Sequence, residues 1–122
     1  MKKKDDKLKR KKLQDFISKK VEEYSKKLLL DTYEIELRTA DLDVLANCTT
    51  THPYTKVTLR FNITKLLEYD LKYVEQTVIH ELLHIHLSRF QVVAQNRFTS
   101  EKEITDVHEN LTDIFTKIIY NK

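Results

Sequence analysis

The chain of 122 residues contains no glycine and only one proline, Pro53. Both the Walker and the Rossmann phosphate-binding loops need glycine where the backbone approaches the phosphate, so the sequence excludes these motifs. Tight left-handed turns have to be made by other residues, and asparagine is the usual substitute. The candidates for these turns are Asn47, Asn62 and Asn96.

Cysteine and long apolar segments are also scarce. Cys48 is the only cysteine, so the chain has no internal disulfide, and no neighbour in the sequence marks it as an activated nucleophile. Apolar runs such as Leu28–Leu30 are far shorter than the roughly 20 residues that span a membrane. No apolar stretch follows the basic start, as it would in a signal peptide. We therefore expect a cytoplasmic protein without a membrane segment.

Charge is unevenly distributed along the chain. The net charge is +3, and residues 2–12 contain eight lysine and arginine residues but only two acidic ones, Asp5 and Asp6. We interpret residues 1–12 as a basic, flexible N-terminus that precedes a single domain over residues 13–122. The alternative is a weak contact of this segment with nucleic acid, which would involve phosphates because no aromatic residue lies among the first fifteen.

Hydrophobic periodicity predicts an α+β domain with the order α–β–β–β–α–α. An amphipathic pattern predicts a helix over residues 7–30, and alternation of apolar and polar side chains predicts a strand from Tyr33. A turn is expected at Thr51–Tyr54. The other expected elements are strands at Asp43–Thr50 and Lys56–Ile63, a helical turn at Thr64–Glu68, a central helix from Asp70 to Phe90 and a last helix from Ser100.

The central and last helices each begin with a recognisable signal. Asp70 is a candidate N-cap, and Ser100 with Glu103 three residues later forms a candidate capping box. The small sheet is expected to pack against the first and central helices. Apolar residues of the last helix recur at helical spacing and are expected to face the core, namely Ile104, Val107, Leu111, Ile114, Phe115 and Ile118.

The central helix contains the motif His80-Glu81-Leu82-Leu83-His84. Residues four apart lie on one face of a helix, so the two imidazoles can reach one ion. Zinc suits two imidazoles and a carboxylate, and Glu81 can take a proton from a metal-bound water without being a ligand. The motif therefore predicts a metal site for hydrolysis. The alternative is a pair of histidines that hold no metal.

A third protein ligand has to come from elsewhere in the chain. Leu87 and Phe90 stand where metzincins have glycine and histidine, so that extension of the motif is excluded. The remaining candidates lie on the last helix, which contains the segment from His108 to Asp113. His86 is two residues from His84 and faces nearly the opposite way, so we expect it to have a surface or core role.

The segment from His108 to Asp113, taken with the motif, resembles the thermolysin-type gluzincins. In that family a downstream helix presents the third ligand as a glutamate, followed four residues later by an aspartate. The resemblance implies that Glu109 is the third ligand and that Asp113 orients a ligand histidine through its other ring nitrogen. His108 is the main alternative ligand, and the further alternatives are Glu101, Glu103, Asp106 and Asp113.

The layout over roughly residues 30–120 is similar to that of minimal zincin-like metallopeptidases from phages and bacterial mobile elements. This resemblance implies one zinc ion, a protein or peptide substrate, and Glu81 as the general base. Such folds hold the substrate along a sheet edge, and we expect that edge at Lys56–Ile63. The strand residues assigned to substrate binding are Lys56, Thr58, Arg60 and Asn62.

Several alternatives stay open after this comparison. A repressor-cleaving regulatory protease and a SprT-like, DNA-associated protease both use the same motif, although the histidine and cysteine segments typical of the latter are missing. A non-catalytic, zinc-stabilised binding module is the alternative outside enzymes, and the presence of Glu81 argues against it because metal binding does not need this residue. His52 and Tyr54 are expected to serve the turn, with donation to an oxyanion as the alternative.

Overall fold

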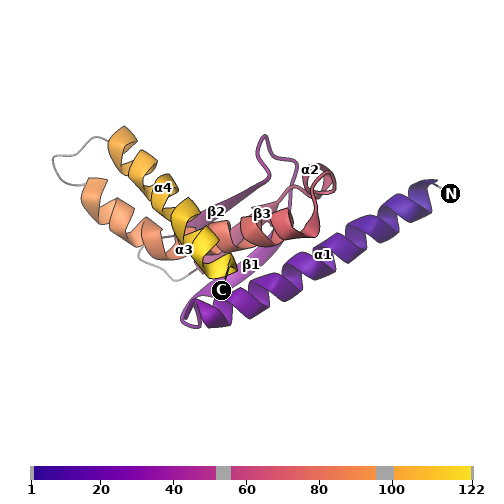
Figure 1. Ribbon diagram of the computed structural model, residues 1–122, viewed down its shortest axis with the longest axis horizontal. Coiled ribbons are helices and arrows are strands. Elements are labelled where there is room, and N and C mark those ends of the chain that lie inside the picture. Colours follow the sequence, from indigo (N-terminus) through magenta and orange to yellow (C-terminus); the bar gives the residue numbers. More distant parts are fainter. Residues whose placement is uncertain (1, 52–55, 96–100, 122) are drawn as a thin grey trace.

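The computed structural model describes residues 2–51, 56–95 and 101–121, and leaves out the side chains of residues 2, 51, 89–95 and 101. These residues form a small α+β fold with four helices and one mixed sheet of three strands (Figure 1). The predicted order of elements agrees with the structure. The elements are α1 (Lys2–Lys27), β1 (Glu34–Thr39), β2 (Ala46–Thr51), β3 (Lys56–Phe61), α2 (Ile63–Leu66), α3 (Leu71–Gln95) and α4 (Glu101–Tyr120).

The first helix starts earlier than predicted. Because α1 begins at Lys2, residues 2–12 belong to the same continuous helix as the residues that follow. Figure 1 shows this end of α1 projecting beyond the other elements. Burial begins at Leu13 and continues at Ile17, Val21 and Tyr24, which share one face of the helix. Arg10 ties the exposed part to α2, since its Nη1 donates to Thr64 Oγ1 at 2.9 Å.

The C-terminus of α1 is closed by a Schellman motif. The Leu30 amide donates to the Ser25 carbonyl at 2.9 Å, and the Leu29 amide donates to the Lys26 carbonyl at 3.2 Å. Leu29 has φ 58°, a left-handed conformation that favours glycine. It is the only residue with positive φ in the described part of the chain, so the prediction that Asn47 and Asn62 make left-handed turns is wrong. Asn96 lies outside the described residues.

The sheet has the order β1-β3-β2, with β3 parallel to β1 and antiparallel to β2. The prediction that Lys56–Ile63 forms a sheet edge is therefore wrong, because β3 is hydrogen-bonded on both sides. Its side chains explain the central place: Val57, Leu59 and Phe61 are almost completely buried, while Thr58 and Arg60 on the other face are half-buried. The edges of the described sheet are β1 and β2.

Residues 40–45 connect β1 to β2 across one end of β3. The buried Asn62 holds this connection, since its Nδ2 donates to the Leu42 carbonyl at 2.8 Å. The same side chain caps α2 by accepting from the Lys65 amide through Oδ1 at 3.2 Å. Lys65 Nζ adds a hydrogen bond of 2.6 Å to the Asp43 carbonyl. The predicted contact of Asn62 with a substrate is thus replaced by a structural role.

The central helix α3 starts as predicted. Asp70 Oδ1 accepts from the Tyr73 amide at 2.9 Å, which confirms the N-cap. The helix is in contact with α1, β2 and α4, and it supplies the largest part of the core. Its buried apolar residues are Val74, Val78, Ile79, Leu82, Leu83 and Ile85. None of the helices in the described ranges is both long and apolar enough to cross a membrane.

The last helix, α4, packs mainly against α3 and turns an unexpected face toward it. Ile104 is buried as predicted, but the other buried residues of this face are His108, Thr112 and Thr116. The two threonine hydroxyls are satisfied, since each donates at 2.7 Å to the carbonyl four residues earlier. The prediction that the apolar stripe faces the core is wrong for four residues, which are exposed: Val107, Ile114, Phe115 and Ile118.

Candidate metal centre

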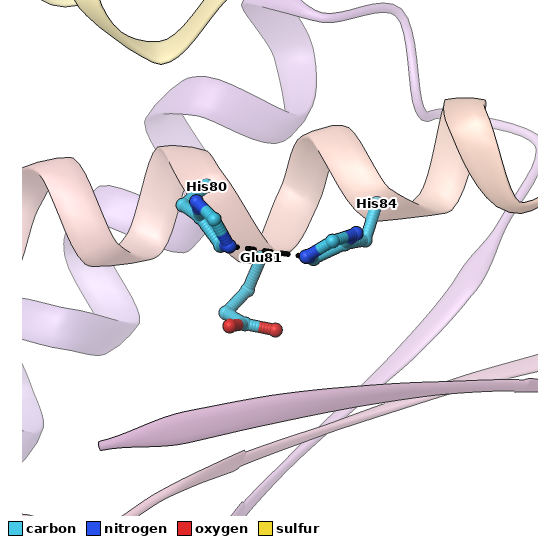
Figure 2. Close-up of side chains that lie close together, drawn as sticks. All are labelled: His80, Glu81 and His84. Carbon is cyan, nitrogen blue, oxygen red and sulfur yellow. Dashed lines mark hydrogen bonds between the residues drawn. The ribbon is translucent and has the colours of Figure 1, made fainter. Parts of the chain in front are cut away.

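Helix α3 brings the three residues of the motif together, as its 3.6-residue repeat requires. His80 Nε2 and His84 Nε2 lie 3.1 Å apart, and the two rings are nearly perpendicular, with an interplanar angle of 80°. Figure 2 shows both rings on one side of the helix, with the Glu81 side chain extending from α3 toward the strands. One ligand atom from each of the three residues lies within 4.8 Å of the others, so this group could hold a metal ion.

A second carboxylate reaches the same two nitrogens from α4. Glu109 Oε1 lies 3.1 Å from His84 Nε2, and Glu109 Oε2 lies 3.4 Å from His80 Nε2. The structure thus presents two candidates for a third ligand, Glu81 and Glu109. Glu81 is 6% exposed on the sheet side, whereas the Glu109 side chain is 50% exposed and contacts both imidazoles directly. Those contacts favour Glu109 as the third ligand, and Glu81 then lies beside the metal position without being a ligand.

The spacing of these atoms can be compared with a zinc site. Nitrogen and oxygen ligands about 2.0–2.2 Å from zinc, at tetrahedral angles, lie about 3.3–3.5 Å from one another. The separations among the histidine nitrogens and the Glu109 oxygens are 3.1–3.4 Å. The donor set of two imidazoles and one carboxylate is also one that zinc accepts. Both spacing and chemistry therefore fit a small divalent metal ion.

The opposite ring nitrogens are also engaged by α4. Asp113 Oδ1 lies 2.9 Å from His80 Nδ1, and His108 Nε2 lies 2.8 Å from His84 Nδ1. A partner at Nδ1 fixes the ring orientation and directs Nε2 toward the shared position. Since His108 meets His84 on the nitrogen that points away from Glu109, its geometry is that of an orienting group. The sequence did not indicate this role, because it depends on how α4 packs.

Burial changes the ionisation of the central residues. The pKa of Glu81 is raised to about 7, first by burial and then by the nearby charge of Glu109. The pKa of His84 is lowered to about 4, by burial and by the neighbouring His80 and His108. Burial also lowers the pKa of His108. At neutral pH His84 is therefore in the neutral form that a metal ligand requires.

A cleft with two lobes lies beside the motif, bounded by β2 on one side and α4 on the other. The larger lobe has a volume of about 640 Å³, and the smaller about 520 Å³. Both lobes are lined by Val44, Ala46, His80 and Glu81, so the motif lies where they meet. The larger lobe extends to Tyr69 and Tyr73, whose rings stack at 4.6 Å; neither these rings nor the wall near Val44 was anticipated from the sequence.

Of the predicted site residues, the structure brings together His80, Glu81, His84, His108, Glu109 and Asp113. The β3 residues assigned to a substrate edge line neither of the two lobes. His86 is exposed and contacts the residue that follows α1, with its Nε2 2.6 Å from the Leu28 carbonyl oxygen. His52 and Tyr54, and the side chain of Glu101, lie outside the described residues.

Cys48 lines the smaller lobe but does not resemble a nucleophile. Burial, with the charge of Glu81 as a second cause, raises its pKa to about 12. At neutral pH the thiol is therefore protonated and unreactive. This agrees with the interpretation of the sequence, in which no neighbour activates Cys48.

Comparisons with known protein families, with curated proteins and with solved structures found no significant match. The site therefore has to be interpreted from its own geometry and chemistry.

Proposed function

We propose that the protein is a small zinc-dependent hydrolase of peptide bonds, with the layout of a minimal zincin. The observation that carries the proposal is the meeting of His80, His84 and Glu109 around one position, with atoms 3.1–3.4 Å apart, next to the buried Glu81. In this assignment the first three residues hold the metal, and Asp113 and His108 orient the two imidazoles through Nδ1.

A zinc ion held by these residues would lower the pKa of a bound water to about 7 and would polarise the carbonyl of a substrate. The residues of the chain divide the remaining work. Glu81 accepts a proton from the attacking water and returns it to the leaving nitrogen. In the metal-free protein its pKa of about 7 is close to neutral, as suits a group that both accepts and donates a proton. Glu109 is more exposed and stays with the metal.

We assign substrate binding to the cleft between β2 and α4. Strand β2 is an edge of the described sheet, and Ala46, Cys48 and Thr50 along it line the smaller lobe. An extended peptide can add to such an edge through main-chain hydrogen bonds. This assignment replaces the predicted edge at β3. The two narrower predictions, a repressor-cleaving and a DNA-associated protease, stay predictions.

Metal analysis combined with Glu81→Gln tests the proposal. We expect one zinc ion per chain in both proteins, because Glu81 is not a ligand. Cleavage of a proteome-derived peptide mixture, followed by mass spectrometry, is expected to fall about 10²–10⁴-fold in the variant because the general base is lost. Glu68→Gln, an exposed position just before α3, is the matched control and should cleave like the wild type.

Three outcomes would contradict the proposal. A purified protein that binds no divalent metal removes the proposed centre altogether. A Glu81→Gln variant with undiminished cleavage removes the proposed base, and zinc binding without any cleavage in the wild type would instead support the binding-module alternative.

The third ligand is tested by comparing Glu109→Ala with His108→Ala. We expect zinc affinity to fall at least about 100-fold when the ligand Glu109 is lost, and about tenfold when the orienting group His108 is lost. Competition with a fluorescent zinc chelator measures both constants. Asp106→Asn, an exposed position on the same helix, should leave zinc affinity unchanged. The reverse ranking of the first two variants would make His108 the ligand.

A further inference from the structure

Helix α4 carries an apolar stripe that no described element covers. Val107 is 54% exposed, Ile114 44% and Ile118 51%, and Leu111 between them is half-buried. Phe115 lies beside the stripe and is 39% exposed. Four of the twelve large apolar side chains exposed in the described chain therefore lie together on one helix. A contiguous apolar surface of this kind marks an interaction site, whereas scattered exposed residues do not.

The outer stripe consists of Val107, Leu111, Ile114 and Ile118, and its spacing indicates the kind of element that could pack on it. Its steps are four, three and four residues, which is the heptad spacing that packs one helix against another. Opposite the stripe, α4 turns His108, Thr112 and Thr116 toward α3. One side of α4 therefore packs within the molecule, and the exposed side has the spacing of a helix–helix contact.

The stripe is complementary to itself when two copies lie antiparallel. In that arrangement Val107 faces Ile118 of the second copy and Leu111 faces its Ile114, so each apolar side chain meets another. Charge favours the same direction. Asp106 near the start of α4 and Lys117 near its end are both exposed, and antiparallel pairing brings them close to each other. Parallel pairing would leave Asp106 and Lys117 about 16 Å apart along the helix axis.

We propose that the outer stripe of α4 binds a second copy of this chain, forming an antiparallel α4–α4 contact about a two-fold axis between Leu111 and Ile114. Four side chains of one helix cover much less than the roughly 800 Å² per partner of a standard interface. The contact is therefore weak, with dissociation expected at micromolar to millimolar concentration. Lys117 also lines the larger lobe of the cleft, but the stripe contains none of the proposed metal ligands, so the contact does not depend on the proposed function.

Sedimentation velocity of the full chain between about 5 and 500 µM tests the contact. The wild type is expected to shift from monomer to dimer over this range, and Ile114→Asp is expected to stay monomeric because a carboxylate would be buried at the centre of the contact. Leu71→Asp is the matched control, since Leu71 is 55% exposed on α3 and should still allow dimers. Helical circular dichroism verifies that both variants are folded.

A monomeric wild type at every concentration would overturn the proposal, and so would equal loss of dimer in the control. The direction of the helices is tested by single cysteines in a Cys48→Ser background. In an antiparallel pair the two copies of residue 114 are offset by about 4–5 Å along the helix axis, and the two copies of residue 107 by about 16 Å. Disulfide-linked dimers are therefore expected for Ile114→Cys and not for Val107→Cys. Equal cross-linking at both positions would refute the antiparallel arrangement.

Discussion

Two glutamates of the candidate metal centre, Glu81 and Glu109, differ in their surroundings, and this difference supports the separate roles proposed for them. Glu81 is buried between α3 and the sheet, whereas half of the Glu109 side chain is exposed at the cleft. Burial disfavours the charged form of Glu81, and the charge of Glu109 adds to this effect, so the pKa of Glu81 rises to about 7. A group with this pKa suits proton transfer, while the exposed carboxylate suits metal binding.

The raised pKa of Glu81 predicts how the stability of the metal-free protein depends on pH. Because the folded pKa lies above the usual 4.5, this group's contribution is complete below about pH 4.5 and is lost as pH rises through 7. Glu81→Gln removes the carboxyl that ionises, and with it this loss of stability at higher pH. We expect its stability relative to the wild type to increase by about 1–3 kcal/mol between pH 5 and pH 8. Urea unfolding in the presence of a chelator measures it.

The control for this experiment is Glu22→Gln, at an exposed position of α1. Its stability relative to the wild type should stay nearly constant over the same pH range. His84 has the opposite dependence, since its pKa is lowered to about 4 and its contribution is lost as pH falls from 6.5. That contribution is common to the proteins compared and largely cancels. A Glu81→Gln difference that does not change with pH would contradict the prediction.

Helical spacing predicted the meeting of His80 and His84, because residues four apart share a face whatever the fold. Glu109 and Asp113 were anticipated only from a family resemblance, and the structure brings both to the imidazoles. The place of His108 at Nδ1 of His84 could not be predicted, since it depends on the angle at which α3 and α4 pack. At the residue scale, contacts within one helix could be predicted from the sequence spacing, whereas contacts that depend on the packing of α3 against α4 could not.

At the scale of single elements, the end of α1 offers a direct test. Leu29 adopts φ 58° because the Schellman motif requires a left-handed residue and the chain has no glycine to provide it. Leu29 is 77% exposed, so replacing it removes little packing. We expect Leu29→Gly to raise the free energy of unfolding by about 1 kcal/mol, as thermal and urea unfolding would show.

The matched control is Lys19→Gly, ten residues earlier, at an exposed position in the interior of the helix. There the same substitution should lower the free energy of unfolding by about 1 kcal/mol, because glycine is unfavourable in a helix interior. If both variants were destabilised equally, the left-handed conformation of Leu29 would carry no strain.

Two elements were predicted correctly in type but wrongly in setting. The alternation of β3 predicts a strand, yet it does not reveal how many neighbours the strand has, and the topology places β3 in the centre. The apolar periodicity of α4 predicts a helix, but its most apolar side is turned outward because the side with His108, Glu109 and Asp113 meets the motif. Specific polar contacts here override the general preference for burying apolar surface.

At the scale of the whole molecule, the last helix contributes little to the apolar core. The main cluster of buried apolar residues comes from α1, the sheet, α2 and α3, and α4 adds only the partly buried Ile119 and Tyr120. Helix α4 is otherwise joined to α3 through its inner face and the residues of the metal centre. A metal ion that bridges α3 and α4 should therefore stabilise the attachment of α4 in particular.

Hydrogen exchange followed by mass spectrometry measures this effect. On addition of zinc we expect the protection of α4 amides to increase at least about tenfold, which corresponds to about 1.4 kcal/mol, while α1 amides change little. The increase should disappear in Glu109→Ala, because the bridge from α4 is then lost. A uniform increase across α1 and α4 would show that the metal stabilises the molecule as a whole, contrary to the prediction.

The connection from β1 to β2, which crosses the end of β3, has a consequence for how changes in sequence could alter the cleft. Its last residues, Val44 and Leu45, line the larger lobe of the cleft. Side-chain hydrogen bonds from Asn62 and Lys65 hold the connection in place. Extra residues inserted between β1 and β2 would be added at the lining of this lobe, outside the paired residues of all three strands. Changes in this one connection could therefore alter the shape of the cleft while the arrangement of the candidate metal centre stays constant.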